Sequence, residues 1–263
     1  MRKECLTIIG TAHVSKESVE EVKDTIYGEK PEVVAIELDY NRFIRLSKKK
    51  SGTKEEKNMR VTEIVKEKKV GIYVTSGILS FIQGKIGAEL DVKPGSEMIA
   101  AIDAGYDIGA KIALIDRDIN ITLQRAINKM GLFEKLKFLF SLIYAMFSRG
   151  DELEIEDLKK QETLEEVMEY FKKTSPSVYE VLVQERDAYL ANSILGIEKD
   201  HVVAVVGAGH KKGINHYLDN PDEIPSIEEL TDTKKSGFPW MRIILLFIII
   251  LIILTILKFF IFI

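Results

Sequence analysis

Residues 201–210 have the sequence HVVAVVGAGH, in which five consecutive apolar residues lead into a glycine-rich turn that ends at His210. An uninterrupted apolar run bounded by glycine is typical of a strand that is buried on both faces of a parallel sheet. Three further runs have the same character, and they are CLTIIG at 5–10, VVAIEL at 33–38 and KIALID at 111–116. Each run is followed by a helical pattern, so the sequence predicts an α/β fold around a mainly parallel sheet.

Helical patterns connect the predicted strands. We expect helices over residues 15–27, 41–49, 119–129 and 209–218. The stretches from about 58 to 106 and from about 131 to 197 are too long for ordinary connections between strands. We therefore interpret both as helical insertions within one domain that covers residues 1–230.

The last part of the sequence predicts a membrane anchor. Nineteen of the 21 residues from 243 to 263 are apolar, and a helix of about 20 residues spans the hydrocarbon core of a bilayer. Residues 231–241 then form a linker, and residues 242–263 form one C-terminal transmembrane helix. Lys234, Lys235 and Arg242 precede the apolar segment, so the positive-inside tendency places the preceding domain in the cytoplasm.

Composition excludes several classes of protein. An apolar content of 46% excludes a wholly disordered chain, and a net charge of −4 excludes a strongly basic, general nucleic-acid binder. The single cysteine excludes an internal disulfide framework and a CxxC metal site. We therefore expect no nucleic-acid partner, whereas a homo-oligomer is compatible with this organisation.

Polar side chains follow the predicted strands at the edge where an α/β sheet usually binds its ligands. Gly10-Thr-Ala-His13 follows the first strand, and Gly207-Ala-Gly-His210 follows the last. Glu37 lies at the end of the second strand, and Asp116 and Arg117 lie at the end of the third. If the strands are parallel, we expect all of these side chains to be neighbours.

Two imidazoles and a carboxylate are a suitable ligand set for a divalent transition metal such as Mn²⁺, Co²⁺ or Zn²⁺. The predicted metal ligands are His13, Glu37 and His210. Glu37 serves as a ligand or as a general base in this hypothesis, and Arg117 stabilises an oxyanion. The alternative is structural: a buried histidine often caps a loop, and a buried Glu–Arg pair is often only an ion pair.

Several segments together resemble the TraB/PrgY family, which is related to the Tiki and GumN proteins and more distantly to ChaN and erythromycin-esterase-type folds. The segments are GTAHVSKESVEEV, PEVVAIELDYNR, PGSEMIAAIDAGYDIGAKIALIDRDINITLQRA, ERDAYLA and VVAVVGAGHKKGI. The resemblance implies a metal-dependent hydrolase with His13, Glu37 and His210 as metal or catalytic residues and Arg117 as their polar partner. Glu97 and Arg186 also match polar positions of the family, and we include Arg186 among the catalytic candidates.

Three functions follow from these observations. The first is a membrane-anchored, metal-dependent hydrolase of the metallopeptidase type that acts on a peptide or amide. The second is a non-catalytic, membrane-anchored protein that sequesters a peptide or small ligand in the same site. The third is dinucleotide binding, suggested by Gly207-x-Gly209-x-x-x-Gly213, but the required strand about 20 residues later is absent from the pattern.

Overall fold

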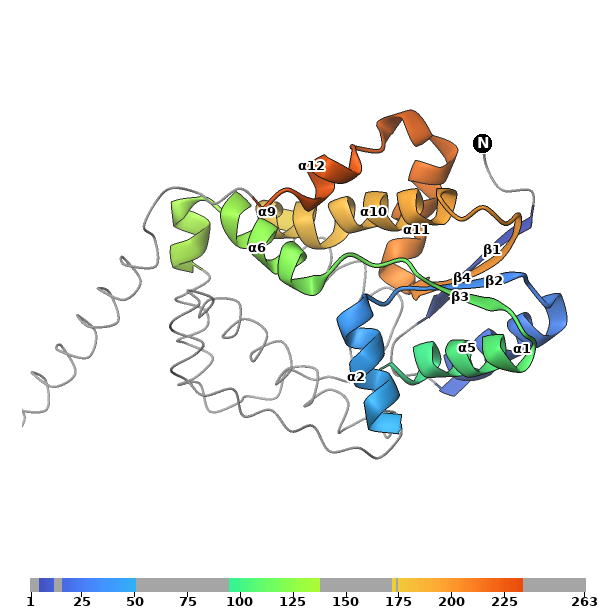
Figure 1. Cartoon of the computed structure of the whole chain (residues 1–263). Coiled ribbons are helices and arrows are strands. Elements are labelled where there is room, and N and C mark those ends of the chain that lie inside the picture. Colours follow the sequence, from blue (N-terminus) through green and yellow to red (C-terminus); the bar gives the residue numbers. More distant parts are fainter. Residues whose placement is uncertain (1–4, 12–15, 51–94, 138–171, 174, 234–263) are drawn as a thin grey trace, which may run out of the picture.

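The computed structural model describes residues 5–11, 16–50, 95–137, 172–173 and 175–233. Four strands form one parallel sheet (Figure 1), and they are β1 (Cys5–Thr11), β2 (Val33–Ile36), β3 (Lys111–Leu114) and β4 (His201–Gly207). Their order across the sheet is β1-β4-β2-β3, so the last strand in the chain lies between the first two. The predicted α/β fold with a parallel sheet is confirmed.

The bounds of the strands matter for the site. β4 has the predicted bounds, whereas β2 and β3 each end two residues earlier than the sequence predicts. The chain leaves the sheet at the end of β2, where Leu38 N–H donates to Ile36 O at 2.7 Å. As a result, Glu37 and Asp116 lie beyond the ends of their strands, at the carboxyl edge of the sheet.

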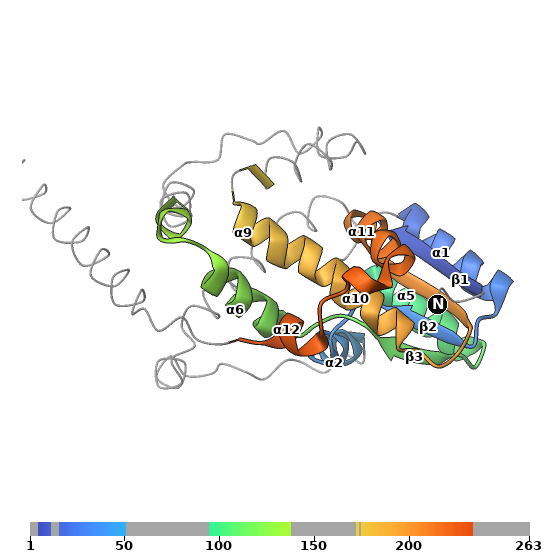
Figure 2. The same ribbon diagram turned by 90° about the horizontal axis from the view of Figure 1, so that it is seen from above.

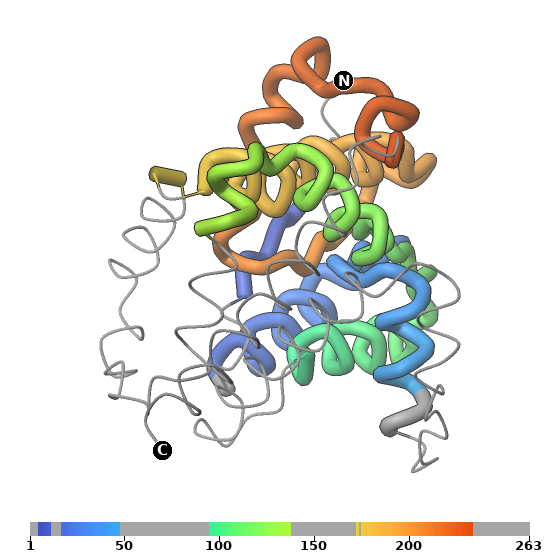
Figure 3. The backbone as a smooth tube through the Cα atoms, turned by 90° about the vertical axis from the view of Figure 1, so that its left-hand side faces the viewer, coloured from blue at the N-terminus to red at the C-terminus, as the bar shows by residue number. Residues whose placement is uncertain are grey.

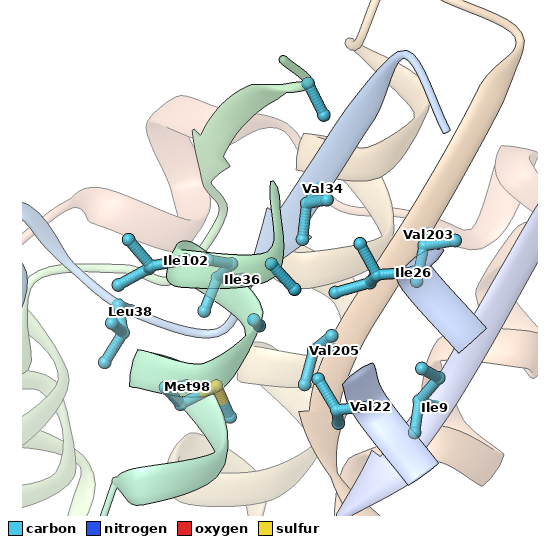
Figure 4. Close-up of a cluster of buried hydrophobic side chains, with 13 residues drawn as sticks. Ile9, Val22, Ile26, Val34, Ile36, Leu38, Met98, Ile102, Val203 and Val205 are labelled. Carbon is cyan, nitrogen blue, oxygen red and sulfur yellow. The ribbon is translucent and has the colours of Figure 1, made fainter. Parts of the chain in front are cut away.

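Helices cover both faces of the sheet (Figures 1 and 2). One face is covered by α1 (Lys16–Glu29) and α5 (Ser96–Asp107), and the other by α10 (Glu185–Leu195) and α11 (Ala208–Asp219). Alternate residues of the central strands enter two separate cores. Figure 4 shows the first core, in which Val34, Ile36, Val203 and Val205 pack against α1 and α5. The second core contains Val33, Ala35, Val202, Ala204 and Val206. Burial on both faces explains why the strands are apolar throughout.

The remaining elements complete the domain. The four predicted helices are confirmed within two residues, as α1, α2 (Tyr40–Lys50), α6 (Ile119–Lys129) and α11. Helices α5 and α10 fall inside the stretches that the sequence assigns to insertions, yet they belong to the two layers that cover the sheet. The parts of these stretches at 51–94 and 138–171, and the apolar segment 242–263, lie outside the described residues. Within the described ranges, no helix has the length and apolar character needed to cross a membrane.

A second group of helices extends beyond the sheet. It comprises α6, α9 (Pro176–Tyr179), the π-helical turn η2 (Glu180–Gln184), the 3₁₀ turn η3 (Pro221–Glu223) and α12 (Ile227–Thr231). In Figure 3 the green segment of α6 lies beside the gold segment that contains η2 and α10. The first turn of α6 is stabilised by Asp118, whose carboxylate accepts the backbone N–H of Asn120 at 2.7 Å.

A buried cluster of charges joins these helices. The carboxylate of Glu185 accepts hydrogen bonds from Arg117 at 3.1 Å and from Arg125 at 2.7 and 2.8 Å. Arg117 also donates to the carbonyl of Leu230 at 2.5 Å, and Arg125 donates to that of Asp232 at 2.5 Å. Burial opposes ionisation of Glu185, but the two arginines outweigh it, so the pKa of this carboxyl lies below its usual value. The cluster therefore fastens α12 to α6 and α10.

We expect the substitution Glu185→Gln to lower the free energy of unfolding by about 3 kcal/mol at neutral pH, because it leaves a buried guanidinium without its counter-ion. The pKa of Glu185 is lower in the folded chain than in the unfolded chain, so this stabilisation is complete above the unfolded pKa. It is lost as the pH falls through the folded pKa. Urea unfolding at about pH 7 and about pH 3 should therefore show a smaller loss of stability on acidification for the variant than for the wild type.

The matched control is Glu180→Gln, in the preceding turn of the same helical stretch. The Glu180 side chain is 46% exposed and pairs with Lys129, so its loss should change the stability by less than about 1 kcal/mol. Equal losses for the two variants would contradict the buried-cluster interpretation.

Candidate functional site

Three polar side chains meet at the carboxyl edge of the sheet. Glu37 follows β2, Asp116 follows β3, and His210 lies in the first turn of α11, directly after β4. Glu37 Oε2 accepts the backbone N–H of Gly207 at 2.6 Å, and Glu37 Oε1 lies 3.7 Å from His210 Nε2. The structure thus brings Glu37 and His210 together from positions far apart in the sequence, while their chemical roles stay predictions.

The guanidinium of Arg186, from the first turn of α10, lies between these three side chains. It donates to Asp116 through Nε at 3.2 Å and through Nη2 at 2.8 Å. Nη2 also donates to Glu37 Oε1 at 2.6 Å, and Nη1 lies 3.0 Å from His210 Nε2. Burial alone would lower the pKa of Arg186, but Asp116 and Glu37 outweigh it and the pKa is raised. Arg186 is therefore the positive centre of the site.

The donors of Arg186 can be counted, because a guanidinium has five N–H groups in a fixed plane. Four of them donate to Asp116, Glu37 and His210. The fifth, on Nη1, has no partner among the residues that the structure describes. The Arg186 side chain is 15% exposed. Nη1 of Arg186 thus carries one charged N–H that no described residue accepts.

The hydrogen bonds of His210 define its tautomer. A guanidinium only donates, so Nε2 must accept from Arg186, and the ring proton of the neutral imidazole then lies on Nδ1. Nδ1 donates to Asp187 Oδ1 at 2.6 Å. Asp187 is 5% exposed, and burial raises the pKa of its carboxyl, although the bond from His210 partly offsets this effect. The lone pair of His210 Nε2 thus faces Arg186 and Glu37.

Arg117 lies elsewhere. Its guanidinium, in a residue only 1% exposed, donates to Thr122, Glu185 and the carbonyls of Val181 and Leu230. The polar partner of Glu37 and His210 is therefore Arg186 in place of the predicted Arg117. Burial is the main reason that the pKa of Arg117 is lowered.

The two remaining candidates are His13 and Glu97. His13 lies outside the described residues. Glu97 is buried at 2% exposure in the first turn of α5, and it is not among the groups that bind Arg186.

The described side chains do not by themselves form a metal site. Glu37, Asp116 and His210 carry suitable donor atoms, but each of them accepts an N–H from Arg186. The guanidinium thus takes the place that an ion bound to the same atoms would need. Within the ranges that the structure describes, no group of three His, Cys, Asp or Glu side chains could hold a metal ion.

Sequence reasoning missed Asp187. It follows Arg186 in the ERD segment, but its partner His210 is 23 residues away, and no local pattern links the two. The one available signal is Gly213, a glycine inside the predicted helix that follows the last strand, because such a glycine often marks a close approach of another group.

Comparison with known proteins agrees with the resemblance found in the sequence. The model of the TraB/PrgY/gumN family matches residues 2–223. An uncharacterized protein of Methanocaldococcus jannaschii is 41% identical over 241 residues, which cover 88% of this chain and 58% of that protein. The TraB domain-containing proteins of Bos taurus and Homo sapiens are each 27% identical over 254 residues, covering 88% of this chain and 67% of theirs. This chain belongs to the TraB/PrgY/gumN family.

Proposed function

We propose that the chain is a membrane-anchored hydrolase that acts on a peptide or amide bond at the carboxyl edge of its sheet. The observation that carries the proposal is the Arg186 guanidinium, which is held by Glu37, Asp116 and His210 and carries one further N–H that no described residue accepts. A positioned, charged donor is what a carbonyl oxygen requires when negative charge develops on it.

The residues can be given roles in such a reaction. The substrate carbonyl oxygen accepts the remaining N–H of Arg186 Nη1. The proposal further requires His210 Nε2 to release its own bond from Nη1, which frees its lone pair. His210 then takes a proton from water, the hydroxyl adds to the carbonyl carbon, and Arg186 holds the oxyanion. When the C–N bond breaks, the proton on Nε2 passes to the leaving amine. Asp187 stabilises the protonated ring through Nδ1, in the manner of a His–Asp pair.

We expect His210→Gln to reduce turnover of a peptide library by at least about 100-fold, because a general base contributes roughly 10²–10⁴ to a rate. The matched control is His216→Gln on the same helix. His216 pairs with Glu223 at an exposed position, so this variant should keep wild-type turnover. Products are identified by mass spectrometry.

Two outcomes would contradict the hydrolase. The first is cleavage that persists in His210→Gln, which would place the chemistry elsewhere. The second is binding of library peptides by the wild type without any cleavage, which would favour the alternative of a non-catalytic, sequestering protein.

Metal assistance is a second form of the same proposal. It requires His13 to join Glu37 and His210 as ligands, and His210 Nε2 to exchange Arg186 for the ion. A bound Mn²⁺, Co²⁺ or Zn²⁺ would supply a water that is activated at neutral pH.

Elemental analysis of the purified protein tests the metal. The chain has four histidines, so the double variant His13→Ala/His210→Ala can be matched with His201→Ala/His216→Ala. We expect the first pair to lose the metal and the second pair to retain it. An unchanged metal content in the first pair would rule out the predicted ligand set.

The anchor rests on the sequence of residues 242–263 and on the cationic residues before it. We propose that this segment spans a membrane and that the α/β domain faces the cytoplasm. The full chain should resist extraction from membranes by alkaline carbonate, whereas a chain that ends at residue 233 should be released. Protection of the α/β domain from protease added on the cytoplasmic side would contradict this topology.

A further inference from the structure

Position 213, one helical turn after His210, must be a glycine because another side chain lies too close to it. Gly213 lies on α11, three residues after His210 and on the side that faces α10. A Cβ atom at this position would lie 2.0 Å from Asp187 Oδ2 and 2.5 Å from Asp187 Cγ. The carboxylate of Asp187 thus occupies the volume that any side chain at position 213 would need.

The glycine is costly to the helix itself. A glycine inside a helix destabilises it by roughly 1 kcal/mol relative to alanine. Gly209 on the same helix differs, because a Cβ atom there would meet nothing within 4 Å. On this helix the steric need for glycine therefore falls on position 213 and not on position 209, and the three atoms nearest to a Cβ at 213 all belong to Asp187.

Asp187 uses its two oxygens differently. Oδ2 lies against the backbone at Gly213, and Oδ1 accepts the Nδ1–H of His210 at 2.6 Å. A side chain at 213 would push the carboxylate out of its recess and break one of the two hydrogen bonds that select the Nδ1–H tautomer, leaving only the bond from Arg186 to Nε2. Without Asp187 to hold Nδ1, the ring would be free to turn away from Arg186 and Glu37, and both tautomers would be populated.

We infer that Gly213 is a positioning residue, which sets the tautomer of His210 by making room for the carboxylate of Asp187. Two glycines of the pattern 207-209-213, which suggests dinucleotide binding in the sequence, thus serve the polar network instead. Gly207 donates its N–H to Glu37, and Gly213 admits Asp187. The importance of this tautomer for turnover rests on the proposed function, but the tautomer itself does not.

Nitrogen-15 NMR of the histidine rings tests the inference without a substrate. At a pH where the imidazole is neutral, wild type and Gly209→Ala should both show His210 as a single Nδ1–H tautomer. Gly213→Ala and Asp187→Gly should each show a mixture of the two tautomers instead. The His210 signals are assigned by their absence in His210→Gln. A folded Gly213→Ala protein with the wild-type tautomer would overturn the inference.

A mutant cycle covers the case in which Gly213→Ala does not fold. The Cβ atom of Asp187 would itself lie 2.9 Å from a new Cβ at 213, so the whole side chain is removed with Asp187→Gly. In that background Gly213→Ala should no longer lower the melting temperature. An equal loss in both backgrounds would show that Asp187 is not the obstacle, and the inference would fail. If the variants change the tautomer but the wild type cleaves no peptide, the inference on Gly213 stands and only the proposed hydrolase activity is refuted.

Discussion

The arrangement at the edge of the sheet depends on one guanidinium. Glu37 and Asp116 follow neighbouring strands, and their side chains are each only 4% exposed. Two buried carboxylates repel one another and lose hydration, and a cation between them offsets both costs. Arg186 is this cation and still reaches His210, because its five donors point along several directions in one plane. Arg186 therefore balances the charges of Glu37 and Asp116, and in the proposed function the same group binds the ligand oxygen.

Three consecutive residues connect the fold to the site. Glu185 binds Arg117 and Arg125, Arg186 binds the strand ends, and Asp187 binds His210. Successive residues of a helix point about 100° apart, so one turn of α10 can serve three partners. The π-helical turn η2 ends directly before Glu185, and such turns are frequent at functional sites. Because the three residues are rigidly linked, the cluster that holds α12 also supports the position of Arg186 and Asp187.

The sequence could not show whether Arg117 or Arg186 is the partner of Glu37. The sequence predicts Arg117 as the partner of Glu37 because it adjoins Asp116 at the end of a strand. The two side chains take different directions where the chain bends after β3: Asp116 binds Arg186, whereas Arg117 binds Thr122 and Glu185. Arg186 is 70 residues from Asp116, and no local pattern relates the two.

The sequence by itself determined the strands, four of the helices around them, the parallel sheet, the family and the meeting of Glu37 with His210. These follow from periodic apolar patterns and from the rule that parallel strands end at one edge. Only the tertiary structure decided the strand order, the placement of α10 across one face, and which arginine enters the site. Helix packing sets these features through contacts between distant segments, such as Asp187 against Gly213, and local composition does not encode such contacts.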